Sequence, residues 1–101
     1  MERVGLTMKH QELKDYFALM ETFHSRRISA VQFEKGYMAL FKADQRLFPE
    51  AIFNVLNQLF SDVDAFVADP VIRRQNDLDE QQLLACSRGA YEKLMELVET
   101  G

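Results

Sequence analysis

One stretch of the chain, residues 52–67, limits the possible folds more than any other. Its apolar side chains recur at steps of three and four residues, which place them on one face of an α-helix, whereas a half-buried strand would show strict alternation. The apolar positions are Ile52, Val55, Leu56, Leu59, Phe60, Val63, Phe66 and Val67. We therefore predict a helix whose last turns are closed by Pro70, because proline cannot continue a helix and biases Asp69 away from helical geometry.

Three other segments repeat this periodicity. The two nearest the N-terminus each begin with a helix-start signal. The first is expected to run from about residue 8 to residue 23, with Thr7 as its N-cap. The second opens on a capping box, in which Ser29 and Gln32 each satisfy a free backbone amide at the helix start. Inside this helix, Gly36 costs about 1 kcal/mol relative to alanine, so we expect another helix to approach closely there.

The starts of the last two helices are also marked. Pro49 suits the first turn of the helix that contains residues 52–67, because its missing amide proton is not needed there. The final helix is expected to begin near Asp77 or Asp79, either of which can act as its N-cap. Four amphipathic helices with short connections predict an all-α fold, an antiparallel four-helix bundle.

The composition is that of a globular domain, since 48% of the 101 residues are hydrophobic and 28% are charged. We assign residues 1–7 to an N-terminal extension and residues 8–101 to a single four-helix domain. No segment approaches the ~18 apolar residues of a membrane span, and the N-terminus lacks the apolar core of a secretory signal. We therefore expect a soluble cytoplasmic protein without a membrane partner. The net charge of −4 argues against direct binding to nucleic acid, which usually requires a basic face.

Motifs for catalysis or metal binding are scarce. The sequence contains no glycine-rich phosphate loop, no Cys-x-x-Cys and no His-Glu-x-x-His. Glu21 and His24 form one Glu-x-x-His pair, but a di-iron bundle needs two such pairs and two further glutamates, and His10 has no matching glutamate. The single cysteine, Cys86, is expected to be a small buried apolar residue in a reducing compartment. We therefore expect no enzymatic activity and no metal or other cofactor.

Acidic residues gather where the helix of residues 52–67 ends. Asp62, Asp64 and Asp69 lie in or just past its last turns, where the helix dipole disfavours negative charge by about 0.3 kcal/mol or more per residue. On a helical wheel, Asp62 and Asp69 fall together beside one edge of the apolar face, and Asp64 lies beside the other. The fold gives no reason for these carboxylates, which leaves two interpretations open: a cationic protein partner or a solvated helix end.

A second acidic group follows the loop. Asp77, Asp79 and Glu80 open the final helix, where capping and the helix dipole explain them without a partner. An antiparallel pair of helices brings this group close to the first one. Residues 61–80 therefore combine six acidic side chains with only two basic ones, Arg73 and Arg74.

Two segments resemble the signatures of one bacterial family. Residues 28–35, Ile-Ser-Ala-Val-Gln-Phe-Glu-Lys, are similar to the Ile-Ser-Ala-x-x-Phe-Glu opening found in small colicin-like immunity proteins. Residues 59–66, Leu-Phe-Ser-Asp-Val-Asp-Ala-Phe, and the following Ala-Asp-Pro at 68–70 resemble the second signature. Residues 77–80, Asp-Leu-Asp-Glu, fit the opening of the last helix in that family. Together the matching segments cover roughly residues 23–83.

The resemblance implies a four-helix immunity protein that neutralises a cognate nuclease toxin, expected to be a tRNase of the bacteriocin or contact-dependent growth-inhibition type. In the colicin D type of the family, acidic side chains occupy the basic cleft that would hold tRNA phosphates. The matching positions here are Asp64 and Asp69, with Asp62 beside them. The expected toxin-binding residues are Asp62, Asp64, Asp69, Asp77, Asp79 and Glu80. The alternative is a non-enzymatic helical-bundle adaptor or regulatory protein that binds another protein through exposed apolar side chains.

Overall fold

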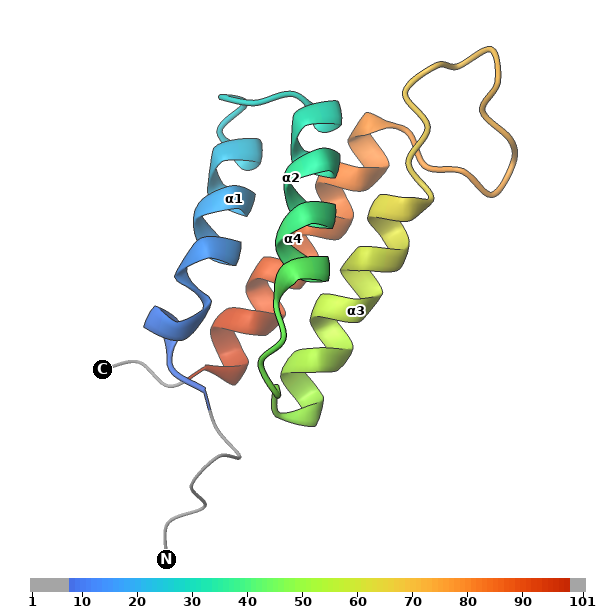
Figure 1. Ribbon diagram of the computed structural model, residues 1–101. Coiled ribbons are helices and arrows are strands. Elements are labelled where there is room, and N and C mark those ends of the chain that lie inside the picture. Colours follow the sequence, from blue (N-terminus) through green and yellow to red (C-terminus); the bar gives the residue numbers. More distant parts are fainter. Residues whose placement is uncertain (1–7, 99–101) are drawn as a thin grey trace, which may run out of the picture.

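The computed structural model describes residues 8–98 and confirms the all-α prediction. Its elements are the 3₁₀ turn η1 (His10–Leu13) and the helices α1 (Lys14–His24), α2 (Ala30–Ala43), α3 (Glu50–Asp64) and α4 (Glu80–Leu97). Successive helices reverse direction, so the α1–α2 and α3–α4 connections lie at one end of the bundle and the α2–α3 connection at the other (Figure 1). The predicted extension of residues 1–7, with Thr7 as a cap, and the chain end at 99–101 lie outside the described residues.

The first helix starts later than predicted. A 3₁₀ turn covers His10–Leu13, and the α-helix begins only at Lys14. The carbonyl oxygen of Glu12, which an α-helix would use internally, instead accepts a hydrogen bond of 2.6 Å from the guanidinium of Arg46. This contact from the α2–α3 connection favours the tighter turn at the start of α1.

The predicted helix-start signals are largely confirmed. Ser29 Oγ accepts from the Gln32 amide at 3.1 Å, and Gln32 Oε1 accepts from the Ser29 amide at 2.8 Å. Of the two predicted caps of α4, Asp79 is the one used. Pro49 stands at the N-cap of α3, one residue before the first turn. Ser29 and Asp79 satisfy backbone amides that have no partner within the helix, whereas Pro49 makes no such bond.

The core lies between the four apolar faces. Its buried apolar residues are Met8, Leu13, Tyr16, Phe17, Met20, Phe23, Ala30, Phe33, Tyr37, Ile52, Leu56, Leu59, Val63, Phe66, Leu83, Ala90, Leu94 and Val98. The hydroxyl of Tyr37 donates to the Leu56 carbonyl at 2.8 Å, so this phenol is satisfied inside the core. A Cβ at Gly36 would lie 3.1 Å from Leu19 Cδ1, which confirms the predicted close approach of another helix and identifies that helix as α1. None of the described helices is long and apolar enough to cross a membrane.

Two predictions about the stretch after Val63 are wrong. The helix α3 ends at Asp64, and Phe66 is buried through an isolated parallel bridge to Leu78 instead of on a helical face. The bridge is formed by two backbone hydrogen bonds, from Val67 N to Leu78 O at 3.0 Å and from Leu78 N to Ala65 O at 2.8 Å. These bonds use backbone groups that a continuing helix would need, so the chain leaves the helix after Asp64. The helical-wheel prediction that Asp69 lies beside Asp62 is therefore wrong.

Candidate functional site

Residues 61–80, which we term the acidic end, carry the net charge of the whole protein. Six of the 16 acidic side chains and two of the 12 basic ones lie here, which leaves ten of each in the rest of the chain. The net charge of −4 is therefore concentrated on the last turn of α3, the loop that projects from the bundle, and the start of α4 (Figure 1). Such an asymmetry along the chain gives this segment a negative field that attracts cationic partners, although Arg26 and Arg27 of the α1–α2 connection lie at the same end of the bundle.

The loop between α3 and α4 is held by its own hydrogen bonds. The guanidinium of Arg73 folds back and donates to the carbonyls of Val67 at 2.9 Å and Ala68 at 3.2 Å. On the other side of the loop, the Arg74 amide donates to Asp77 Oδ2 at 2.9 Å, and the Asp77 amide donates to the Arg74 carbonyl at 3.0 Å. The loop is therefore a defined surface feature, and Arg73 binds backbone oxygens rather than an acidic side chain.

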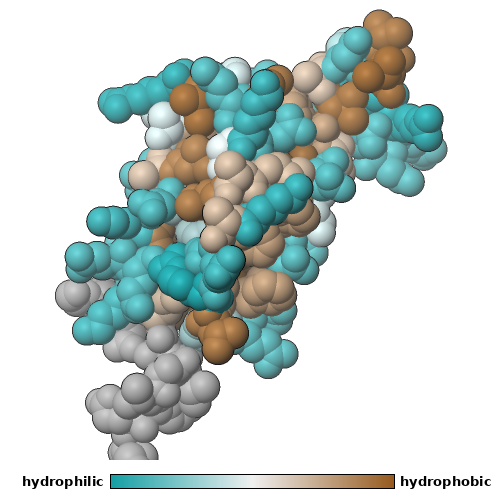
Figure 2. All heavy atoms as spheres, in the orientation of Figure 1, coloured by the Kyte–Doolittle hydropathy of each residue, from teal (hydrophilic) through white to brown (hydrophobic). Residues whose placement is uncertain are grey.

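The outer end of this loop exposes two large apolar side chains that the sequence interpretation missed. Val71 is 87% exposed and Ile72 is 66% exposed. Figure 2 shows hydrophobic side chains at the outer end of the projecting loop, next to hydrophilic ones. A usable sequence signal existed, because two branched apolar residues directly after Pro70 in a polar loop have no helix face to pack on.

Asp64 and Asp69 are both available to a partner. Both are exposed, one as the last residue of α3 and the other in the loop. The Asp64 carboxylate makes no hydrogen bond or ion pair within residues 8–98. Asp69 Oδ1 accepts from the Val71 amide at 2.9 Å, which leaves the other oxygen free. Both carboxylates therefore present unused acceptor capacity to solvent.

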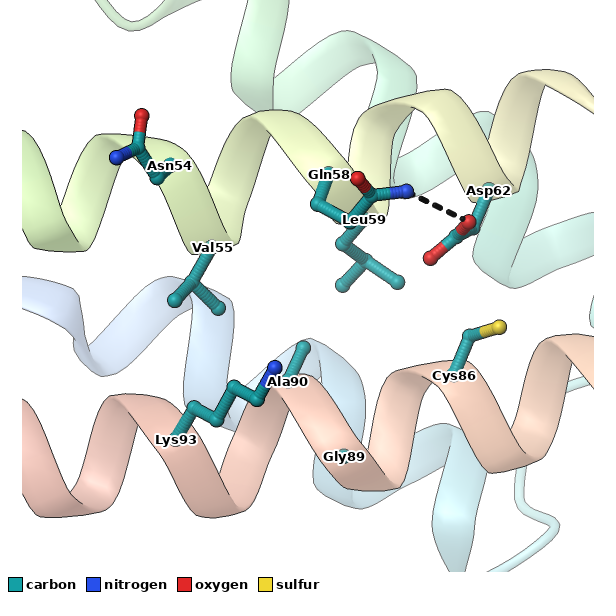
Figure 3. Close-up of a pocket in the computed structure, with 9 residues that line it drawn as sticks. All are labelled: Asn54, Val55, Gln58, Leu59, Asp62, Cys86, Gly89, Ala90 and Lys93. Atoms are coloured by element: carbon teal, nitrogen blue, oxygen red, sulfur yellow. Dashed lines mark hydrogen bonds between the residues drawn. The ribbon is translucent and has the colours of Figure 1, made fainter.

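Asp62 lies apart from these two, in the wall of a groove between α3 and α4. Its Oδ1 accepts from Gln58 Nε2 at 3.2 Å, and its side chain is half-buried. The groove has a volume of about 450 Å³. Figure 3 shows Asp62 opposite Cys86 toward one end and Lys93 toward the other. Asp62 is therefore the acid of the groove, whereas Asp64 and Asp69 lie on open surface.

Cys86 differs from its prediction, because it is half-buried and lines this groove instead of sitting in the core. Burial raises the pKa of the Cys86 thiol, and the negative charge of Asp62 raises it further. The thiol is therefore held in its protonated, unreactive form. A Cβ added to nearby Gly89 would meet no heavy atom within 4 Å, so no internal packing requires a glycine there.

Two of the other three predicted acids are hydrogen-bonded within the fold. Asp79 caps α4 by accepting from the Gln82 amide at 2.8 Å, and Asp77 Oδ2 is bonded to the Arg74 amide. Glu80 is exposed in the first turn of α4 and lines a hollow together with Arg26 and Arg27 of the α1–α2 connection, but it makes no hydrogen bond or ion pair within residues 8–98. These three acids thus contribute charge to the acidic end while also stabilising it.

The one Glu-x-x-His pair has ordinary structural partners. Glu21 Oε2 accepts from the Tyr91 hydroxyl at 2.5 Å, and His24 Nε2 lies 2.8 Å from Ser87 Oγ. Burial lowers the pKa of His24, and the nearby charge of Arg88 lowers it further. Within residues 8–98, no three His, Cys, Asp or Glu side chains are placed to hold a metal ion.

A polar cluster that the sequence interpretation missed lies at the opposite end of the bundle. Asp44 forms an ion pair of 2.7 Å with Arg46 and accepts a hydrogen bond of 2.9 Å from the Tyr16 hydroxyl. Hydrogen bonds from Arg46, and a further one from Tyr16, hold the pKa of Asp44 at about 2. The cluster fastens the α2–α3 connection to α1, so its perturbed carboxylate has a structural explanation.

The comparisons with known proteins identify the family. The model of the family described as bacterial self-protective colicin-like immunity matches residues 12–94, which includes α1 to α3 and most of α4. No curated protein and no solved structure matches the chain. Proteins of this family are inhibitors that bind a cognate toxin, which favours toxin binding over the adaptor alternative. The chain belongs to the colicin-like immunity family and is a protein that neutralises a bacteriocin toxin.

Proposed function

We propose that the toxin is a nuclease, of the tRNase class found among bacteriocins and contact-dependent growth-inhibition toxins, and that the acidic end covers its basic active-site cleft. The central residues of this proposal are Asp62, Asp64 and Asp69. The other residues of the proposed surface are Asp77, Asp79 and Glu80. The observation that carries the proposal is the concentration of the net charge in residues 61–80. The proposed compartment is the cytoplasm, where tRNA is found.

The physical basis is competition for phosphate-binding groups. A nuclease holds its substrate with lysine and arginine side chains that neutralise phosphates, so its active site is basic. A preformed acidic surface is attracted to the same groups, which raises the association rate, and once bound it excludes the substrate. The toxin therefore loses activity without any chemical step on the part of the inhibitor.

The six acids are expected to contribute unequally. Asp64 and Asp69 have free carboxylate oxygens on open surface, so binding a lysine or arginine costs them little desolvation and breaks no bond. Asp79 would have to serve a toxin cation while capping α4. We therefore expect Asp64 and Asp69 to make direct ion pairs, and the acids at the start of α4 to act mainly through their field.

The test uses the C-terminal domain of the toxin encoded beside this gene. Asp64→Lys is expected to weaken its binding about 100-fold, since a like charge then faces the basic cleft. Affinity of the original protein should fall steeply with salt, and its inhibition should be relieved by added tRNA in competition. The matched control is Glu92→Lys, an exposed charge reversal on α4 outside the acidic end. Equal affinities for both variants, or a toxin domain without nuclease activity, would contradict the proposal.

A further inference from the structure

The strongest unassigned surface is the pair Val71 and Ile72, which we term the apolar tip. Within residues 8–98 it is the one place where two adjacent large apolar side chains are both more than half exposed. The tip lies at the outer end of the projecting loop (Figures 1 and 2). Exposed apolar residues that occur singly need no explanation, but a projecting pair favours aggregation unless a partner covers it.

The backbone of the tip is fixed by one of the proposed toxin-binding acids. The Val71 amide donates to Asp69 Oδ1 at 2.9 Å, and the Ile72 amide donates to the Asp69 carbonyl oxygen at 3.3 Å. Arg73, the next residue, is bonded to the carbonyls of Val67 and Ala68. The tip and the Asp69 carboxylate are therefore held at a fixed separation, so that they can contact one partner surface together with little loss of conformational freedom.

The charge around the tip decides what kind of partner can cover it. An anionic lipid surface would be repelled by the acidic end, and Arg73 is bonded within the loop. A second copy of the chain would bring two surfaces together that each carry the protein's net charge of −4. A protein that is basic around an apolar hollow satisfies both the acids and the tip.

We infer that the apolar tip inserts into an apolar hollow beside the cationic cleft of the toxin and supplies much of the energy that keeps the complex together. This inference rests on the proposed function, because it identifies the covering partner as the basic toxin. Interfaces commonly concentrate binding energy in a desolvated apolar centre with a charged rim. The acids then govern how fast the complex forms, and the tip governs how slowly it separates.

The experiment measures association and dissociation rates for the C-terminal domain of the toxin encoded beside this gene, at two salt concentrations. The double variant Val71→Ser with Ile72→Ser is expected to bind about 100-fold more weakly, almost entirely through faster dissociation and with the same salt dependence. The matched control is Leu47→Ser, because Leu47 is 96% exposed on the connection at the opposite end of the bundle. Its rates are expected to equal those of the original protein.

Three outcomes would overturn the inference. Unchanged dissociation of the double variant would remove the tip from the interface. A dimer of the original protein that disappears in the double variant would assign the tip to a second copy. Binding to vesicles containing anionic lipid that the double variant loses would assign it to a membrane surface.

The same rates separate this inference from the proposed function. If Asp64→Lys leaves association and salt dependence unchanged while the tip variant dissociates faster, the acidic-cleft account fails and apolar docking to the toxin stands. If Asp64→Lys slows association and the tip variant dissociates normally, the proposed function stands and the inference fails.

Discussion

The two connections at opposite ends of α3 contain similar residue types, but their charged side chains have different partners. Each has at least one acidic residue, at least one arginine and at least one exposed apolar side chain. In the α2–α3 connection, Arg46 binds Asp44 at 2.7 Å and Tyr16 donates to the same carboxylate, so the charges are neutralised internally. In the α3–α4 loop, Arg73 binds backbone carbonyls, and the carboxylate of Asp64, the last residue of α3, is left to solvent.

The difference shows how a charged loop can be assigned to the fold or to a partner. A carboxylate with a strongly lowered pKa is already stabilised by its neighbours, as Asp44 is, and it has little left to offer a ligand. An exposed carboxylate without an internal partner keeps its interaction energy for whatever approaches. A perturbed pKa often indicates a functional site, but here the most perturbed carboxylate belongs to the structural end.

The largest expected effect on stability tests the structural end. Asp44→Ala removes the acceptor of both Arg46 and the Tyr16 hydroxyl, and it should lower the free energy of unfolding by about 1–3 kcal/mol. Urea unfolding followed by circular dichroism measures the loss. Toxin affinity should be unchanged where the variant is folded; weaker binding without loss of stability would place this connection in the interface.

A pH titration tests the same end by a smaller effect. The folded pKa of Asp44, about 2, is below the ordinary value of about 3.9, so the carboxylate stabilises the fold above that ordinary value. The contribution should be lost as the pH falls from about 4 through about 2. The stability difference between the original protein and Asp44→Asn should therefore shrink over this range in urea unfolding. A difference that stays constant would show that the ion pair contributes nothing to folding.

The fold was predictable because its evidence is repeated along the chain. Apolar periodicity and the Ser29 cap are local signals, and each of α1 to α4 lies within a segment that these signals indicate, although α1 starts later and α3 ends earlier than predicted. The end of α3 was not predictable in this way. Pro70 indicates that a helix must stop before it, but the bridge between Phe66 and Leu78 that ends α3 at Asp64 joins residues on two sides of a loop. Periodicity carries no information about that pairing.

The candidate site was predictable only in composition. The sequence indicates six acids in residues 61–80, but not which of them the fold employs. Asp79 could be predicted as a cap from its spacing to Gln82, whereas the hydrogen bond from Val71 to Asp69 depends on the loop conformation. The carboxylate of Asp44 that pairs with Arg46 also accepts a hydrogen bond from Tyr16, which is 28 residues away in the sequence. No local sequence pattern predicts this contact.

The smallest expected effect on stability compares two acids within the acidic end itself. Asp64→Asn removes a charge from the C-terminus of α3, where the helix dipole opposes it, and should raise the free energy of unfolding by about 0.3 kcal/mol. Asp79→Ala removes the cap of α4 and should lower it by about 1 kcal/mol. Urea unfolding of both variants, with their toxin affinities, measures the contrast.

The two variants should differ in the direction in which stability and toxin affinity change. At Asp64, stability should rise while toxin affinity falls about tenfold, because removing the charge relieves the helix and deprives the partner. At Asp79, stability should fall with only a minor change in affinity. A residue whose removal strengthens the fold and weakens binding is there for its partner. If Asp64→Asn leaves toxin affinity unchanged, the free carboxylate has no more connection to the toxin than the cap has, and the two ends of α3 differ in charge alone.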